Sequence, residues 1–323
     1  MLPIRNAKGK FGEGCVLSFG EDGTRMREGY RDYATAIENF EIRDDDIIVA
    51  TFPKSGTTWT QEMVWLVKNC NNLEGSSADI HQRFPMLEGC TLQFPCKTEH
   101  WLRDSIEYLN QIKNQRFIKT HLPCSLLPND IKYHRKTPKI IYVVRNPKDV
   151  CISYYHHFRN IVGFKGGVED FFELFINDTI LYAPYWKHVI GYYNIKHLSN
   201  VLIIKYEDMK RDLKAVIIKV QRFLESEPLT DKQLRLISQR LDFEFMKDNE
   251  FVNHQSFIDA RKREIPQLTG RFMRAGCNGT YKQEMSTDQI LKFDKWIEKN
   301  ISNTELNDQY WFGNFNEPQH LDT

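Results

Sequence analysis

The fold is decided by residues 47–59, which read IIVATFPKSGTTW. Residues 47–52 are a short apolar run of the kind that forms a buried parallel strand. The period then changes, because Trp59, Met63 and Val67 recur at every fourth position. This spacing predicts an amphipathic helix over 58–69 with its apolar face on a sheet. The stretch therefore predicts a strand, a tight loop and a helix in succession.

The loop between that strand and that helix has the composition of an anion-binding site. Backbone N–H groups at the start of a helix favour negative charge beyond the carboxyl end of the preceding strand. Lys54 adds a positive charge, Gly56 allows close approach of the backbone, and hydroxyl donors stand at Ser55, Thr57 and Thr58. A polar turn without a ligand is the alternative, and it explains this composition poorly. We therefore expect this P-loop-like segment to bind a phosphate.

The order of residues in the loop argues against a nucleoside triphosphate. In the motif G-x-x-x-x-G-K-[ST] the lysine follows the second glycine, whereas Lys54 precedes Gly56 and the first glycine is missing. We see no acidic strand end close by to hold Mg²⁺, and we expect no metal. A kinase or NTPase is thus disfavoured, and Mg²⁺-dependent ATP turnover would revive that hypothesis.

The strand-then-helix pattern recurs along the chain. Apolar runs at 140–144 and 201–204, and a weaker one at 117–120, predict three further strands. Asn146 and Pro147 are a favourable N-cap and first-turn pair for a helix. We predict an α/β fold, a single domain with a central parallel sheet flanked by helices on both faces.

The chain also suggests where that domain begins and ends. We expect an irregular N-terminal leader over 1–40, the main domain over 41–300 and a polar C-terminal tail over 301–323. Capping boxes predict later helices after Thr230 and Ser286. Residues 71–115 are rich in turn residues, so we expect a lid there. Its aromatic side chains look exposed in the sequence: Phe84, Phe94, Trp101 and Tyr108.

The composition excludes several classes of protein. The chain has 323 residues, with 44 Lys and Arg against 43 Asp and Glu, so its formal net charge is +1. A nucleic-acid partner requires a basic excess, and we expect none. No run approaches the ~20 apolar residues of a membrane span, the N-terminal residues lack the apolar segment of a secretory signal, and the seven cysteines have no paired spacing. We expect a soluble, cytoplasmic protein without membrane insertion.

A second group of residues suits another phosphate and a base. Arg145 ends the predicted strand at 140–144, and Ser153 lies in the helix after it; a guanidinium and a hydroxyl together favour phosphate. The basic turn at 274–279 has two glycines and is placed to close over that phosphate. Trp59 and Phe243 are candidates to sandwich an adenine ring. Taken alone, Arg145 is more simply explained as a surface arginine and the 274–279 segment as an ordinary turn. Trp59 and Phe243 are more simply explained as core aromatics.

Together these motifs resemble the cytosolic sulfotransferases over about residues 40–300. The family's loop for the 5′-phosphosulfate stands at 52–59, its Lys-Thr-His-Leu-Pro motif at 119–123, and its 3′-phosphate motif at 145–156. Tyr-Glu-Asp-Met follows at 206–209 and Arg-x-Gly-x-x-Gly-x-x-Lys at 274–282. The resemblance implies that 41–300 is a sulfotransferase domain. It further implies a donor, 3′-phosphoadenylyl sulfate (PAPS), and a product, adenosine 3′,5′-bisphosphate (PAP).

The resemblance also implies roles for individual residues. His121 is the expected general base, Lys54 assists the leaving oxygen, Lys119 supports the transferring group, and Ser153 binds the 3′-phosphate and restrains Lys54. The expected acceptor is a small lipophilic phenol, alcohol, amine or steroid-like molecule, bound beside His121 by Phe84 and Met86. The nucleotide-binding residues implied are Lys54, Ser55, Gly56, Thr57, Thr58, Trp59, Arg145, Ser153, Tyr206, Phe243, Phe272, Met273, Arg274, Ala275 and Gly276.

Several positions depart from the family pattern. Ala275 replaces a lysine in the 3′-phosphate turn, which predicts weaker donor binding. Leu241 and Asp242 replace the Thr-Ser that precede Phe243, so one adenine contact is missing. The family's dimer motif falls on 282–291 with its polar positions changed and its glutamate absent, and we do not assume that dimer.

Three hypotheses remain open from the sequence. The chain is an active sulfotransferase used in detoxification or small-molecule metabolism, or it is a binding protein that keeps the nucleotide site without turnover, which Ala275 and Leu241 favour. In the third, sulfation creates a leaving group that is then eliminated, so that the net reaction is dehydration of an alcohol.

Overall fold

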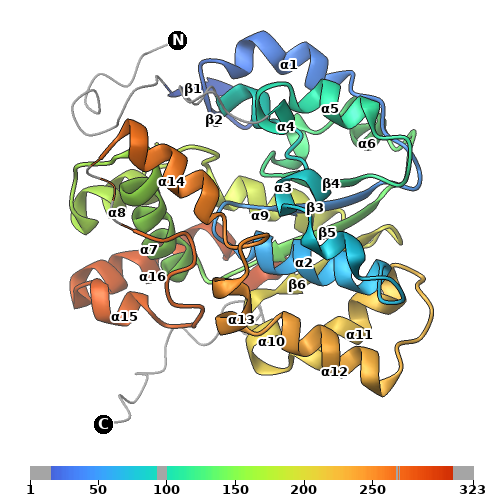
Figure 1. Ribbon diagram of the computed structural model, residues 1–323. Coiled ribbons are helices and arrows are strands. Elements are labelled where there is room, and N and C mark those ends of the chain that lie inside the picture. Colours follow the sequence, from blue (N-terminus) through green and yellow to red (C-terminus); the bar gives the residue numbers. More distant parts are fainter. Residues whose placement is uncertain (1–15, 93–99, 267, 269, 308–323) are drawn as a thin grey trace.

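A four-stranded parallel sheet lies at the centre of the computed structural model, which describes residues 16–92, 100–266, 268 and 270–307 (Figure 1). The strand order is β4-β3-β5-β6. Residue Ile47 at the start of β3 stands opposite Phe117 of β4 and Lys139 of β5. The strands are β3 (Ile47–Thr51), β4 (Phe117–Thr120), β5 (Lys139–Val144) and β6 (Val201–Lys205). The predicted fold class and all four predicted strands are confirmed.

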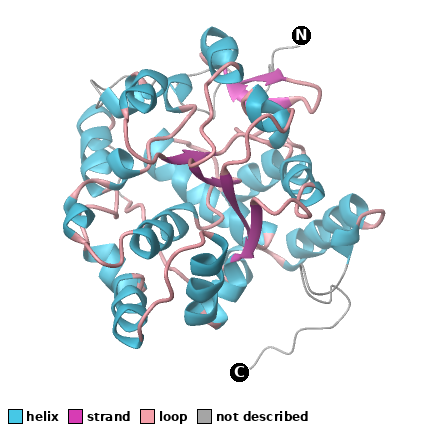
Figure 2. Cartoon of the chain, turned by 90° about the vertical axis from the view of Figure 1, so that its right-hand side faces the viewer, coloured by secondary structure: helices cyan, strands magenta, loops and turns pink. Residues whose placement is uncertain are grey.

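Alternate residues of the central strands enter two separate apolar cores. Ile48 and Ala50 of β3 face one core, and Ile47 and Val49 face the other, as the two-residue period of a strand requires. Figure 2 shows the strands as a narrow layer between helices. The first core is covered mainly by α7 (Pro147–His157), α8 (Val168–Ile176), α9 (Tyr185–Asn194) and α16 (Thr287–Ile301). The second is covered by α2 (Thr57–Lys68), α3 (Ile80–Arg83), α10 (Tyr206–Arg211), α11 (Leu213–Phe223), α12 (Asp231–Arg240) and α13 (Phe243–Asp248).

Shorter helices complete the shell around these layers. They are α1 (Tyr30–Glu38), α4 (His100–Arg103), α5 (Ser105–Gln111), α6 (Asn129–Lys132), α14 (Gln255–Glu264) and α15 (Tyr281–Glu284). Among the described residues, no helix combines the length and the apolar character that crossing a membrane requires.

The strand order creates a crevice at one end of the sheet. From β3 the chain passes to β4 on one side and then to β5 on the other. The carboxyl end of β3 is therefore a topological switch point, where open α/β sheets bind their ligands. The residues that follow β3, β4 and β5 converge there, namely the loop at 52–56, His121 and Arg145.

Local sequence signals set the predicted helix starts correctly. The Asn146 side chain accepts a hydrogen bond from the Lys148 amide, and Pro147 opens α7. The capping boxes of Thr230 and Ser286 begin α12 and α16. Helix α2 begins at Thr57, one residue earlier than the apolar period suggests, because Gly56 is its N-cap.

The expectation of an irregular leader over 1–40 is wrong for its described part. Strands β1 (Val16–Phe19) and β2 (Thr24–Arg27) form an antiparallel hairpin, and α1 follows it. Met26 and Ile37 are fully buried in the first core. The hairpin is also fixed by backbone hydrogen bonds between Arg25 and residues 182–183. These residues are thus part of the domain.

Two further expectations need correction. The polar tail does not begin at residue 301, because Ile301 and Leu306 are buried in the first core; residues 308–323 lie outside the described part. The aromatics of 71–115 are not an exposed set, since Phe84 is fully buried and Trp101 is 8% exposed. Phe94 lies outside the described residues.

Candidate active site

The loop after β3 is shaped for close approach of a ligand. Gly56 has φ +109°, and a Cβ there would lie 2.7 Å from the Tyr206 ring, so only glycine fits without displacing that ring. Lys54 also has positive φ, 70°. The Thr57 hydroxyl is held 2.7 Å from the Thr51 hydroxyl. The Ser55 hydroxyl is buried with no hydrogen-bond partner among the described residues, and Ser55, unlike Lys54 and Gly56 to Trp59, does not line the cavity.

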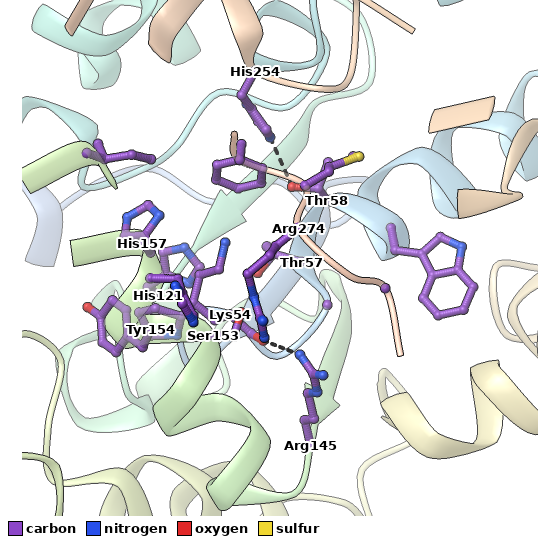
Figure 3. Close-up of a pocket in the computed structure, with 18 of the residues that line it drawn as sticks. Lys54, Thr57, Thr58, His121, Arg145, Ser153, Tyr154, His157, His254 and Arg274 are labelled. Atoms are coloured by element: carbon purple, nitrogen blue, oxygen red, sulfur yellow. Dashed lines mark hydrogen bonds between the residues drawn. The ribbon is translucent and has the colours of Figure 1, made fainter. Parts of the chain in front are cut away.

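Four cationic side chains line the cavity at this loop, namely Lys54, Lys119, Arg145 and Arg274, and Figure 3 labels all of them except Lys119. Burial, with the positive charges of Lys119, Arg145 and Arg274, lowers the pKa of Lys54 to about 7. Burial also lowers the pKa of Lys119 to about 8, against the opposing effect of Glu88. A cluster of like charges is unfavourable unless an anion joins it. The site therefore fits a polyanionic ligand.

Arg145 is positioned at the carboxyl end of β5. Its guanidinium donates to the carbonyl oxygens of Lys54 at 3.2 Å and Cys277 at 3.0 Å, and it lies 4.1 Å from the Tyr206 ring centroid. Its Nε is buried without a partner among the described residues. Arg145 thus joins the β3 loop to the 274–279 turn and keeps one donor for a ligand.

The 274–279 turn closes against α13 and α7. Gly276 has φ +63°, and a Cβ there would lie 2.2 Å from the Phe243 ring. Asp149 accepts hydrogen bonds from the Gly279 amide at 2.8 Å and the Thr280 hydroxyl at 3.1 Å. Arg274 pairs with Glu284 at 2.9 Å. Met273 and Ala275 line the same cavity.

Leu241 and Asp242, which depart from the family pattern, support the two aromatic residues of the candidate adenine site, Trp59 and Phe243. The Trp59 indole donates to the Leu241 carbonyl oxygen at 2.9 Å, and the Trp59 ring meets the edge of Tyr206 at 5.5 Å. Asp242 caps α13, whose first residue is Phe243. The Leu241 backbone therefore positions Trp59. This contact does not need the hydroxyl that the family's threonine would carry at position 241.

His121 is fixed in one tautomer. Its Nδ1 lies 2.8 Å from the Thr51 carbonyl oxygen, which only accepts, so Nδ1 carries the proton. Burial and the charge of Lys119 hold the pKa of His121 well below its usual value. The ring is therefore neutral near pH 7, and Nε2 keeps its lone pair. His121 lines the cavity together with Lys54.

A buried carboxylate that the sequence analysis missed supports His121. Glu88 is fully buried and accepts from the His121 amide at 2.7 Å and the Thr120 hydroxyl at 2.8 Å. His188 binds the His121 carbonyl oxygen at 3.0 Å. Glu88 lies 32 and 33 residues from its partners, so no local motif marks it.

Lys54 is restrained differently from the expectation. Its ammonium lies 3.9 Å from the centroid of the Phe272 ring, and within the described part of the chain no hydrogen bond joins it to Ser153. Ser153 does line the cavity, close to Lys54 in Figure 3. A cation over an aromatic face is favourable while no anion is bound.

The same cavity has a volume of about 440 Å³, and most of its lining is apolar. Met86 lines the cavity as expected, and its backbone forms an isolated parallel β-bridge with that of Lys119. Phe84 does not; it is buried in the second core against Phe117, at 5.1 Å between centroids, so its expected acceptor contact is wrong. The other apolar and aromatic lining residues of the cavity include Trp101, Leu102, Tyr154, Phe158, Ile161 and Phe257.

Comparison with known proteins identifies the family. The model of the sulfotransferase domain matches residues 44–305. The chain belongs to the sulfotransferase family. Among its sulfotransferase relatives, luciferin sulfotransferase of Photinus pyralis is 44% identical over 296 residues, which cover 89% of this chain and 80% of the relative. Human sulfotransferase 1E1 is 33% identical over 287 residues, covering 88% and 93%.

A solved structure shares the architecture of this sulfotransferase. Retinol dehydratase in complex with androsterone and the inactive cofactor PAP superposes with a TM-score of 0.84 at 28% identity, covering 96% of this chain and all of the other. The extent of this match agrees with a single α/β domain.

Proposed function

We propose that this sulfotransferase moves a sulfuryl group from PAPS to a hydroxyl group of a small lipophilic acceptor. The observation that carries the proposal is the position of His121. Its neutral imidazole keeps Nε2 unprotonated in the same cavity as the cation cluster. A base and pre-placed cations at one point suit a group transfer that moves negative charge onto a leaving phosphate.

The donor end supports a nucleotide with two phosphates. The loop at 54–58 is suited to the 5′-phosphosulfate, because it offers helix N–H groups, hydroxyls and Lys54. Arg145 and Ser153, with the turn at 274–276, are suited to the 3′-phosphate. The unpartnered Nε of Arg145, which lines the cavity, favours a bound anion.

The residues suggest how the transfer is assisted. His121 Nε2 takes the proton of the acceptor hydroxyl as its oxygen forms a bond to sulfur, and the bond from sulfur to the 5′-phosphate oxygen breaks. Lys54 and Lys119 stabilise the negative charge on that oxygen and on the transferring group. Glu88 acts as a positioning residue, because it holds the His121 amide.

A specific similarity favours a second candidate activity. Retinol dehydratase shares the fold over almost the whole chain, so elimination after sulfation is a reasonable alternative outcome for an alcohol. The binding-protein hypothesis is weaker, because Leu241 still holds Trp59 and Ala275 removes only one contact.

The test is incubation with PAPS and a panel of luciferin, retinol, androsterone and a simple phenol, followed by mass analysis. A product heavier by one SO₃, with one PAP released per product, supports the transferase. A product lighter by one water supports the dehydratase. Tight PAP binding with no product from any acceptor would favour the binding protein and contradict the proposal.

A further inference from the structure

Two histidines and a threonine form a hydrogen-bonded chain beside the donor loop. The Thr58 hydroxyl lies 3.0 Å from His254 Nε2, which Figure 3 marks. His254 Nδ1 lies 2.7 Å from His81 Nε2. The three residues come from α2, from the start of α14 and from α3, and all of them line the cavity.

The chain is held rigidly at its outer end and at its middle. His81 stacks on Trp101 with 4.3 Å between centroids and 3° between planes. His254 is 4% exposed, adopts φ +56° at the N-cap of α14, and packs at 4.1 Å on Phe272, the ring beneath Lys54. A non-glycine residue in the left-handed region has a strained backbone. The strained residue here, His254, is the one whose imidazole reaches the donor loop.

Each imidazole has one proton to place. Burial lowers the pKa of His81 to about 3 and holds that of His254 well below its usual value, so both rings are neutral near pH 7. Each contact in the chain therefore carries one hydrogen, and the whole chain has two possible directions. In one direction Thr58 donates to His254; in the other it accepts from His254 and is left free to donate elsewhere.

A bound anion selects between the two directions. A phosphate oxygen only accepts, so Thr58 must turn its hydroxyl proton toward it. The Thr58 oxygen then accepts from His254 Nε2, and His254 Nδ1 accepts from His81 Nε2. Both rings satisfy this pattern in neutral form, with the proton on Nε2, so no charge has to move.

We propose that His254 and His81 are positioning residues that orient the Thr58 hydroxyl toward the 5′-phosphate of the donor. The proposal rests on the donor assignment made above. Neither histidine has to touch the nucleotide. Because the outer ring stacks on Trp101 in the apolar end of the cavity, the relay also joins the acceptor wall to the donor loop.

The test uses two nucleotides that differ only in the 5′-phosphate, PAP and adenosine 3′-phosphate, titrated calorimetrically. The variant is His254→Asn, because asparagine tolerates positive φ but is too short to reach Thr58. We expect its Kd for PAP to rise about fivefold, while its Kd for adenosine 3′-phosphate stays within about twofold. The matched control is His134→Asn, at an exposed histidine with φ +53° remote from the cavity.

A double-mutant cycle separates the relay from general damage to the site. If the histidine acts only through the Thr58 hydroxyl, Thr58→Val with His254→Asn binds PAP no more weakly than Thr58→Val alone. Losses that add, or an equal loss for both nucleotides, would overturn the relay. If the wild type itself shows no preference for PAP over adenosine 3′-phosphate, the donor assignment fails first.

A second variant keeps the test valid if His254→Asn does not fold. His81→Phe keeps a ring on Trp101 and removes both ring nitrogens, including the Nε2 that bonds to His254, while His254 and its contact with Phe272 remain. We expect a smaller rise in the Kd for PAP, about two- to threefold, and none for adenosine 3′-phosphate. No change in either Kd would contradict the proposal.

Discussion

The two ends of the cavity differ in how they are built. The proposed donor end comes largely from short contiguous segments that follow β3 and β5, together with the turn at 274–279, so glycines, hydroxyls and cations lie together both in sequence and in space. The apolar lining, which we propose receives the acceptor, comes from single side chains of distant segments, such as Met86, Phe158 and Phe257. The first end is set by backbone geometry and charge, and the second by packing. Substitutions at the two ends should therefore separate donor binding from acceptor binding.

His121 stands where the two ends meet, and its loss should have the largest effect. We expect His121→Ala to lower turnover by about 10²–10⁴-fold, because general-base catalysis supplies that much, while PAP affinity changes less than about twofold. The measurement is the initial rate with the acceptor found in the panel, beside calorimetry with PAP. His134→Ala is the control. A fall in turnover of less than about tenfold would show that another group is the base.

Arg145→Ala should weaken binding of the nucleotide without weakening binding of the acceptor. Loss of charge-assisted hydrogen bonds predicts a rise in the Kd for PAP of about 10- to 100-fold, with the KM for the acceptor nearly unchanged. The Kd for adenosine 5′-phosphate should rise less, because Arg145 also holds the Lys54 carbonyl oxygen. Arg211→Ala, which removes an exposed arginine paired with Asp208, is the control. Equal losses for PAP and acceptor would mean that the two ends are not separate.

The pH dependence of PAP binding should reveal the cation cluster. The pKa of Lys54 is lowered to about 7, and bound phosphates favour its charged form, so binding takes up a proton. Affinity is therefore greatest at lower pH and is lost as pH rises through 7, by about tenfold up to pH 8.5. Calorimetry in buffers of different ionisation enthalpy measures the uptake. Lys54→Met should make the profile shallower and leave the part due to Lys119, whose pKa is lowered to about 8; a flat profile in the wild type would contradict the cluster.

Gly276→Ala is a subtler test of the backbone geometry. The added Cβ would lie 2.2 Å from the Phe243 ring, whereas a Cβ at Gly23, with a similar φ of +69°, meets open space. Both variants should lose about 1 kcal/mol of unfolding free energy from the strained φ, but only Gly276→Ala should also raise the Kd for PAP, by about fivefold. Equal affinity in the two variants would mean that this contact does not shape the donor end.

The difference between the two ends of the cavity also explains which features could be predicted from the sequence. The sheet and the β3 loop follow from local signals, an apolar run followed by a four-residue period, and so do the helix starts at Asn146, Thr230 and Ser286. Most of the residues predicted to bind the donor therefore line one cavity, and their role in donor binding stays a prediction. The sequence could not show which way a side chain faces: Phe84 and Met86 are two residues apart, yet Phe84 is buried in the second core and only Met86, which packs in the first core, also lines the cavity.

Features that depend on distant partners were also missed. The role of Glu88 depends on its hydrogen bond with His121, and the role of His81 depends on its hydrogen bond with His254, which is 173 residues away. The hairpin at 16–27 looked irregular because its apolar residues are few, and it is held largely by backbone hydrogen bonds to residues 182–183. None of these contacts leaves a local pattern.

The most direct test of a donor end built for two phosphates is calorimetric titration of the wild type with PAP, adenosine 3′-phosphate and adenosine 5′-phosphate. Because each phosphate has its own set of cations and N–H donors, we predict that PAP binds at least about tenfold more tightly than either monophosphate. Binding of either monophosphate as tightly as PAP would contradict the account.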